Sequence, residues 1–185
     1  MAKRIIIVTG PIGSGKSTAI KHIRKKGFPT LDLDEISNQI INLKESIKFL
    51  DTNFPGVIKN KKLDRASLAN IVFSDSDKLE KLEEYLHPKI LTEFQQKASK
   101  IKGTLFVEVS APKNIHKDFE CLVISTPESE RIARLIDRGM ELNDIKNRIH
   151  TQRNEDWWNS LGYVILNTSC TSLEQEIDNF INEKI

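Results

Sequence analysis

One nine-residue segment constrains this chain more than any other, because residues 10–18 have the sequence GPIGSGKST. The segment fits the pattern G-x-x-x-x-G-K-[ST] at every defined position. It follows an apolar run, Ile5 to Val8, and precedes a helix expected at about Ser17 to Lys26. A loop in this position directs backbone N–H groups at an anion, at the positive end of the helix. We therefore predict a phosphate-binding loop for a nucleoside triphosphate.

Three side chains of the loop have separate tasks in this prediction. Lys16 places a cation at the β and γ phosphates, Ser17 joins the coordination shell of Mg²⁺, and Thr18 assists near the α phosphate. The alternative is a glycine-rich turn ahead of a helix that carries an exposed lysine. The residues expected to contact the nucleotide are Gly10, Pro11, Ile12, Gly13, Ser14, Gly15, Lys16, Ser17 and Thr18.

Short apolar runs alternate with longer segments of helical periodicity, and this order predicts an α/β fold with a parallel sheet. The length of 185 residues favours a single domain, 1–185. With helices on both faces, the sheet would form a three-layer sandwich of the P-loop NTPase type. The five runs expected as strands are Ile5 to Val8, Thr30 to Leu33, Thr104 to Val109, Cys121 to Ser125 and Tyr163 to Leu166.

A long stretch between the second and third expected strands, about 38–102, has apolar residues at helical spacing and many charged residues. It predicts an inserted subdomain that is helical throughout. Within it, Pro88 is expected to begin a new helix after His87, because proline is tolerated in a first turn. At the start of the C-terminal helix, Thr171 and Glu174 match a capping box.

Composition excludes several classes of function. The 28 Lys and Arg against 26 Asp and Glu leave a formal charge of +2, which is too balanced for a dedicated nucleic-acid binder. The first apolar run is too short for a signal peptide or a membrane span. Cys121 and Cys170 lack neighbouring metal ligands, so structural thiols in a reducing cytoplasm fit best. We expect a cytoplasmic protein with no nucleic-acid or membrane partner.

The group that accepts a proton during phosphate transfer has to come from outside the loop. Asp32 and Asp34 lie two residues apart at the end of an expected strand, where open α/β sheets bind their ligands. Asp34 could accept the proton of an attacking hydroxyl, could cap a helix beginning at Glu35, or could do both. For Asp32, a cap or a loop hydrogen bond is the simpler interpretation.

Three arginines, Arg131, Arg134 and Arg138, have spacings that align them along one helical face. They form either the cationic stripe of a lid, suited to a transferring phosphoryl group, or a solvated face with pairs such as Glu130 to Arg134. Both interpretations remain open at the level of sequence.

Taken together, these segments resemble the dephospho-CoA kinase family over almost the whole chain. The resemblance rests on the segments TGPIGSGKST, LDLDEIS, LDRASLANIVFSD, RLIDR and YVILN, and on the pair His87-Pro88. It implies that the γ-phosphate of ATP is transferred, with Mg²⁺, to the ribose 3′-hydroxyl of dephospho-CoA, the last step of coenzyme A synthesis. It also implies a helical acceptor side at about 38–102 and a lid at about 134–155.

The resemblance implies roles for single residues as well. Asp34 corresponds to the base, and Lys16 and Arg138 act on the phosphates. Asp32, Arg65 and His87 would contact the acceptor, although His87 could instead satisfy a helix end. Two further alternatives concern aromatic and amide groups. Trp157 and Trp158 either stack on adenine or anchor packing, and Asn167 either contacts the base or is a turn residue.

The chain departs from the family pattern at three positions. Asn38 stands where the family usually has an arginine, Glu108 stands where an aspartate is common, and Pro11 replaces the second loop glycine. These departures motivate an alternative, a nucleotide-binding protein that has lost its transfer activity. A second alternative is another P-loop kinase that acts on a nucleoside or a nucleoside monophosphate.

Overall fold

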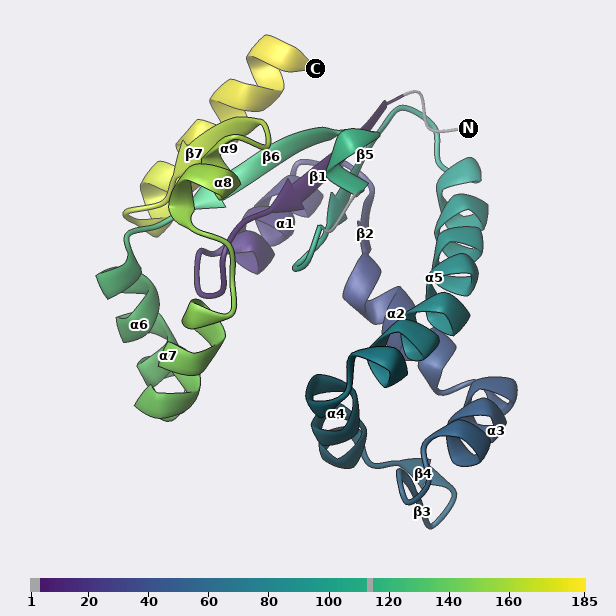
Figure 1. Ribbon diagram of the computed structural model, residues 1–185. Coiled ribbons are helices and arrows are strands. Elements are labelled where there is room, and N and C mark those ends of the chain that lie inside the picture. Colours follow the sequence, from purple (N-terminus) through teal and green to yellow (C-terminus); the bar gives the residue numbers. More distant parts are fainter. Residues whose placement is uncertain (1–3, 113–114) are drawn as a thin grey trace. The chain divides into compact units, whose positions relative to one another are not determined.

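The computed structural model describes residues 4–112 and 115–185, which divide into two compact units (Figure 1). The first unit combines the described residues up to Asp32 with those from Lys100 onward. The second unit is Leu33–Ser99.

A parallel sheet organises the first unit, and among the described residues five strands contribute to it. Their order across the sheet is β2-β5-β1-β6-β7. Strand β1 is central. Strands β2 and β5, which come next in the chain, lie on one side of it, and β6 and β7 lie on the other side. Ligands of such sheets bind beyond the carboxyl ends of the strands at the point where the strand order reverses, which is where β1 ends. The bounds are β1 Arg4–Thr9, β2 Thr30–Asp32, β5 Thr104–Glu108, β6 Glu120–Ser125 and β7 Tyr163–Leu166.

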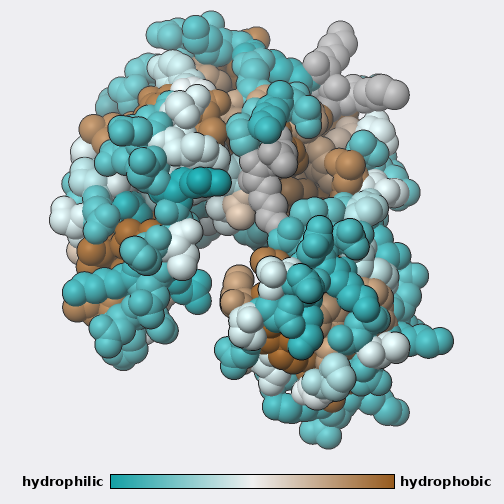
Figure 2. Space-filling model, in the orientation of Figure 1, coloured by the Kyte–Doolittle hydropathy of each residue, from teal (hydrophilic) through white to brown (hydrophobic). Residues whose placement is uncertain are grey.

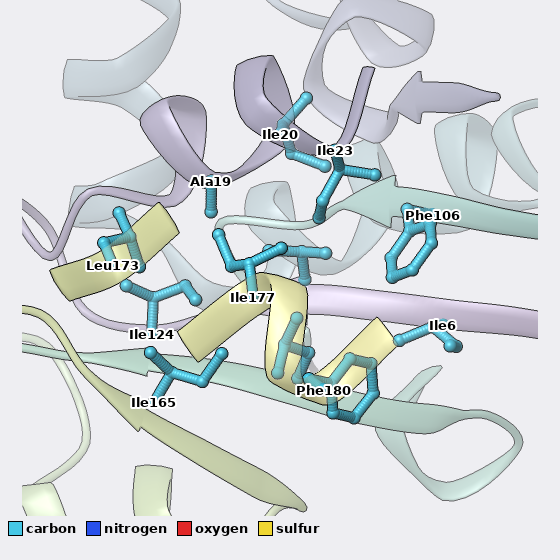
Figure 3. Packing of buried hydrophobic residues seen from close by; sticks show 12 residues of the cluster. Ile6, Ala19, Ile20, Ile23, Phe106, Ile124, Ile165, Leu173, Ile177 and Phe180 are labelled. Atoms are coloured by element: carbon cyan, nitrogen blue, oxygen red, sulfur yellow. The ribbon is translucent and has the colours of Figure 1, made fainter. Parts of the chain in front are cut away.

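Helices accompany the sheet, so the predicted α/β fold is confirmed. Helices α1 and α9 pack together on one face of the sheet (Figure 3), while α8 and the short 3-10 helix η1 contact β6. None of the helices in residues 4–112 and 115–185 has both the length and the apolar character needed to span a membrane. The bounds are α1 Lys16–Lys25, η1 Ile115–Lys117, α6 Glu128–Asp137, α7 Leu142–His150, α8 Glu155–Asn159 and α9 Cys170–Lys184.

The main hydrophobic core lies between this face of the sheet and the two helices α1 and α9 (Figure 3). Side chains alternate along each strand, so Ile6 and Val8 belong to this core, whereas Ile7 faces the opposite side. Ile7 is nevertheless fully buried. Burial on both faces explains why the strands appear in the sequence as continuous apolar runs. The core comprises Ile6, Val8, Ala19, Ile20, Ile23, Phe106, Leu122, Ile124, Ile165, Leu173, Ile177 and Phe180.

The first turn of α9 shows that the predicted capping box was wrong. The reciprocal pair is Ser169 and Ser172: the Ser172 N–H donates to Ser169 Oγ at 3.1 Å, and the Ser169 N–H donates to Ser172 Oγ at 3.2 Å. Because α9 begins at Cys170, Thr171 already lies inside the helix. The pattern favoured Thr171 and Glu174 because it expects Glu or Gln at the third helical position, where the structure has a serine with the same function.

The second unit consists of helices around a small hairpin. Strands β3 and β4 form this antiparallel hairpin, so the prediction of a segment that is helical throughout was wrong here. Asn60 and Lys61 turn the chain with φ angles of 50° and 62°, the conformation of a two-residue hairpin loop. The bounds are α2 Leu33–Ile41, α3 Lys44–Asn53, β3 Ile58–Lys59, β4 Lys62–Leu63, α4 Arg65–Ser74 and α5 Ser76–Ser99.

Helix α5 continues through Pro88, so the prediction that a new helix begins there was wrong, and His87 does not stand at a helix end. Proline lacks an N–H, which removes the hydrogen bond to the carbonyl of Glu84. Helix α5 keeps an apolar face on both sides of this position and packs against α2 and α4. This packing maintains the helix across the missing bond. The buried residues of that face are Leu82, Leu86, Phe94 and Ala98.

Candidate active site

The predicted phosphate loop connects the end of β1 at Thr9 to the start of α1 at Lys16. Two of its glycines have conformations that other residues rarely adopt. Gly10 has a φ of 146°, and a Cβ atom there would lie 2.2 Å from the carbonyl oxygen of Ile124. Gly15 has a φ of 101° and is the N-cap of α1. The glycines therefore allow the loop to pack tightly against the sheet and to enter the helix.

Lys16 is buried and turned back over the beginning of the loop. Its Nζ donates to the carbonyl oxygens of Gly10 at 2.9 Å and Pro11 at 3.0 Å. The alternative of an exposed lysine after a glycine-rich turn is therefore wrong. A buried ammonium group held by two carbonyls is a preformed cationic site for an anion.

Two side-chain oxygens, from α1 and from β5, meet at the start of α1. Ser17 Oγ donates to Glu108 Oε1 at 2.8 Å, and Glu108 is buried at the end of β5. Asp32 ends β2 and is the register partner of Glu108 in the sheet. Hydroxyl and carboxylate oxygens are the ligands that Mg²⁺ prefers. The described part of the chain holds no cluster of three or more His, Cys, Asp or Glu that could bind a metal, so substrate oxygens and water would have to complete the shell.

Asn167, which follows β7, is tied to the phosphate loop by its side chain. Its Nδ2 donates to the carbonyl of Ser14 at 2.7 Å, and the residue is 4% exposed. Thr126, just beyond β6, donates from its hydroxyl to the carbonyls of Ser14 and Asn167 at 3.0 and 3.1 Å. Asn167 is therefore more than a turn residue. Thr126 was missed, although a polar residue directly after an apolar strand was a usable signal.

Arg131 fits neither interpretation offered for it, because it is buried against the loop. Its Nε donates to the carbonyl of Thr126 at 3.1 Å and its NH1 donates to that of Ile12 at 3.4 Å. Burial lowers the pKa of the guanidinium, while nearby Glu128 and Glu155 act in the opposite direction. Arg131 thus supports the loop instead of facing solvent.

Arg134 and Arg138 lie further along the same segment. Arg134 forms the expected pair with Glu130 at 3.2 Å and also donates to the carbonyl of Asn167 at 3.1 Å. Arg138 caps the C-terminus of α6 and is exposed. Both arginines line a pocket of about 170 Å³ beside the loop. Its lining residues are Gly15, Thr18, Arg134, Arg138, Asn167 and Leu173.

The acceptor-side candidates belong to the second unit, apart from Asp32. Helix α2 begins at Leu33 and not at Glu35, so Asp34 lies exposed in its first turn and is not its N-cap. Arg65 is the exposed first residue of α4. His87 is exposed in the middle of α5.

Asp64, within the LDRAS segment, has a structural role at the start of α4. Asp64 is the N-cap of α4 and accepts from the Ser67 N–H at 3.1 Å. Lys59 Nζ donates to the same carboxylate at 2.6 Å. The hydrogen bond from Lys59, followed by the bonds from Ser67, holds the pKa of Asp64 well below its usual range.

Trp158 and Cys121 are packing residues, as one interpretation of Trp158 and the prediction of a structural thiol had it. Trp158 is 4% exposed, and its indole Nε1 donates to the carbonyl of Arg153 at 3.1 Å. Cys121 is buried in β6, and burial raises the pKa of its thiol to about 11. A thiol in this environment stays protonated and is a poor nucleophile.

Comparison with known proteins identifies the family. The family profile described as Dephospho-CoA kinase matches residues 4–174. The chain belongs to the dephospho-CoA kinase family. A dephospho-CoA kinase from Thermus thermophilus is 34% identical over 160 residues, which cover 82% of this chain and 76% of that protein.

Solved structures agree with this assignment. A crystal structure of a Thermus thermophilus protein matches this kinase with a TM-score of 0.92 and 30% identity, covering 100% of both chains. The dephospho-CoA kinase of Campylobacter jejuni matches with a TM-score of 0.70 and 28% identity, over 97% of this chain and 96% of the other. The chain is therefore a P-loop phosphotransferase of coenzyme A biosynthesis, as the sequence segments predicted.

Proposed function

We propose that this kinase transfers the γ-phosphate of ATP to the ribose 3′-hydroxyl of dephospho-CoA, giving CoA and ADP. The observation that carries the proposal is the phosphate loop, in which glycine geometry and the buried Lys16 cation form an anion site between β1 and α1. Family membership supplies the acceptor.

The nucleotide would occupy the loop and the adjoining pocket of the first unit. Amide groups of residues 13–18 would bind the phosphates, and Lys16 would leave its two carbonyl partners to contact the β and γ phosphates. The pocket beside Gly15 and Thr18 would receive the nucleoside, with Asn167 at its wall. Arg138, on the same wall, would stabilise charge on the transferring group as part of a lid at about 134–155.

Asp34 would act as the general base. The acceptor oxygen forms a bond to the γ phosphorus while the bond to the β–γ bridging oxygen breaks; Asp34 takes the hydroxyl proton and ADP leaves. Asp32, Arg65 and His87 would orient the acceptor. The helical unit Leu33–Ser99, expected at about 38–102, would provide the surface that a substrate as large as dephospho-CoA requires.

Ser17 would hold a Mg²⁺ ion directly, with Glu108 acting on it through water. The hydrogen bond between these two side chains, which brings two hard oxygen donors together, supports this assignment. The ion neutralises charge that develops on the phosphates. Glu108 is one carbon longer than the aspartate common in the family, and a water-mediated contact uses that reach. Cysteine use favours a reducing cytoplasm as the place of action.

The decisive experiment compares acceptors under identical Mg²⁺ and ATP concentrations. We expect dephospho-CoA to have the highest kcat/KM and adenosine, which lacks the pantetheine arm, to have a lower kcat as well as weaker binding. Binding energy from the arm orients the reacting hydroxyl, so truncation affects both constants. Adenosine and several nucleoside monophosphates serve as comparison substrates. Preference for a nucleoside monophosphate would favour another type of P-loop kinase, and phosphorylation of no acceptor would favour a nucleotide-binding protein that has lost its transfer activity.

A further inference from the structure

The residue Ile12, in the first half of the phosphate loop, has both of its backbone hydrogen-bonding groups held by distant side chains. Its N–H donates to Gln152 Oε1 at 3.0 Å. Its carbonyl accepts from Arg131 NH1 at 3.4 Å. Arg131 belongs to α6, whereas Gln152 lies between α7 and α8. Two separate elements therefore fix the orientation of one loop residue.

This part of the loop faces the terminal phosphates. Lys16 Nζ contacts the carbonyls of Gly10 and Pro11, directly before Ile12. In a loop of this type the lysine reaches the β and γ phosphates. The first half of the loop therefore lies near the γ-phosphate, while the amides that follow it bind the α and β phosphates. A change at Ile12 should affect the transferred group more than the rest of the nucleotide.

Gln152 has the chemistry that such a position requires. Its amide oxygen satisfies the loop N–H without bringing negative charge next to an anion site. A carboxylate would accept the same hydrogen bond but repel the phosphate. Gln152 also lines a pocket of about 250 Å³ together with Pro11, Arg131 and the buried Trp158. The side chain is half-buried at the wall of this pocket, and its hydrogen bond to the Ile12 N–H holds it there.

We propose that Gln152 is a positioning residue that holds the loop at Ile12 in the conformation required for γ-phosphate transfer. The inference rests on the proposed function, because it takes the loop to bind ATP. Gln152 acts through the backbone of the loop, and its position between α7 and α8 connects that segment to the reacting phosphate.

The test uses two substitutions of similar volume. Gln152→Met keeps a similar side-chain volume but cannot accept from the Ile12 N–H, whereas Gln152→Glu retains an acceptor and adds charge. In Gln152→Met we expect kcat to fall about tenfold, the effect of one lost hydrogen bond. We expect the KM for ATP and the affinity for ADP to change less than threefold. In Gln152→Glu we expect the affinity for ATP to fall more than that for ADP.

A direct measurement of the hydrogen bond accompanies the kinetics. Hydrogen exchange, followed by NMR on the nucleotide-free full chain, should show the Ile12 amide exchanging at least about tenfold faster in Gln152→Met than in wild type. The Val8 amide, inside β1, should not change. Gln175→Met, on the exposed surface of α9, is the matched control and should leave all these quantities unchanged.

Several results would overturn the proposal. Equal exchange of the Ile12 amide in wild type and Gln152→Met would show that the bond does not restrain the loop. An unchanged kcat in Gln152→Met would contradict the proposal. If kcat, ADP affinity and thermal stability all fall together in that variant, Gln152 acts only as a packing residue. If the wild-type chain phosphorylates no acceptor, the proposed function fails. The exchange rates and calorimetric affinities for ATP and ADP then still decide the role of Gln152.

Discussion

The Lys16 ammonium is removed from water and held by two backbone carbonyls. Burying a charge is costly unless hydrogen bonds compensate for it, so the loop keeps this cation ready for a stronger partner. The phosphate oxygens of ATP are such a partner. When the nucleotide binds, the Lys16 ammonium leaves the two carbonyls for the phosphate oxygens, and water replaces it at the carbonyls. The ammonium interacts more strongly with a charged phosphate oxygen than with a neutral carbonyl, so the exchange favours binding of ATP.

Lys16→Ala is expected to lower kcat by at least about 10²-fold, since the lost cation acts on charge that develops at the γ-phosphate. Steady-state phosphorylation of dephospho-CoA measures the effect, and circular dichroism checks that the variant is folded. Lys21→Ala, an exposed lysine in α1, is the control and should keep wild-type activity. A folded Lys16→Ala that turns over at the parental rate would refute the assignment.

Asp34→Asn is expected to lower kcat by roughly 10²–10⁴ while ATP binding persists, because the amide cannot accept the hydroxyl proton. Calorimetry with ATP and a single-turnover assay separate binding from chemistry. Asp51→Asn removes an exposed carboxylate from the same unit and provides the comparison. A kcat within about threefold of wild type would leave Asp34 without a catalytic role.

Residues near the loop show the limit of what the sequence can predict. The motif itself identified residues 10–18, because the chemistry of phosphate binding is encoded locally. Asn167 was recognised as a candidate, but its partner Ser14 lies 153 positions away. Arg131 was placed on the correct helix, and spacing alone could not tell whether solvent or the loop covers that face. Contacts between residues so far apart in the sequence form only when the sheet is assembled.

Helices α1 and α9 form one packed layer, which connects the phosphate loop to the end of the chain. At the element scale, apolar runs predicted every strand of the sheet, because strands buried on both faces leave a strong signal. The hairpin β3–β4 gave no such signal. Its strands have two residues each, and its turn uses Asn60 and Lys61 without glycine. Pro88 misled the prediction because tertiary packing overrides a local helix breaker.

Ile177→Ala in α9 is expected to lower the free energy of unfolding by about 2–5 kcal/mol, the cost of a cavity in a packed core. Ile177 is fully buried in the cluster that α9 shares with α1 (Figure 3). Urea unfolding followed by circular dichroism measures the change. Glu176→Ala, one position earlier and exposed, should change stability by less than about 0.5 kcal/mol. A loss below about 1 kcal/mol for Ile177→Ala would contradict this description of the core.

At the scale of the whole molecule, hydrophilic side chains predominate on the face shown in Figure 2, and each unit has an ionised carboxylate paired with a lysine. In the first unit Asp178 joins α9 to α1, accepting from Lys26 at 2.7 Å and contacting His22 at 2.8 Å. The hydrogen bond from Lys26, and then that from His22, lowers the pKa of Asp178. Asp64 has the corresponding role in the second unit, with Lys59 as its main partner.

Acidification is therefore expected to destabilise both units. A carboxylate whose pKa is lower in the folded state contributes stability that is complete above its unfolded pKa of about 4 and is lost as the pH falls through the folded value. Asp178→Asn and Asp64→Asn should each lower the urea midpoint at pH 7, and the difference from wild type should shrink below about pH 4. Glu176→Gln is the control. A difference that stays constant from pH 7 to pH 3 would exclude this electrostatic origin.

The side-chain amide of Asn167 also has a consequence for the order of biosynthesis. The ribosome produces the phosphate motif before the Asn167 group that holds the Ser14 carbonyl, which follows 153 positions later. At about 5–20 residues per second, this interval is roughly 8–30 s. During that time a nascent chain contains the complete motif but lacks β7 and the Asn167 side chain that holds the loop. We therefore expect the loop to reach its final conformation, and the chain to bind ATP, only after Asn167 has left the ribosome.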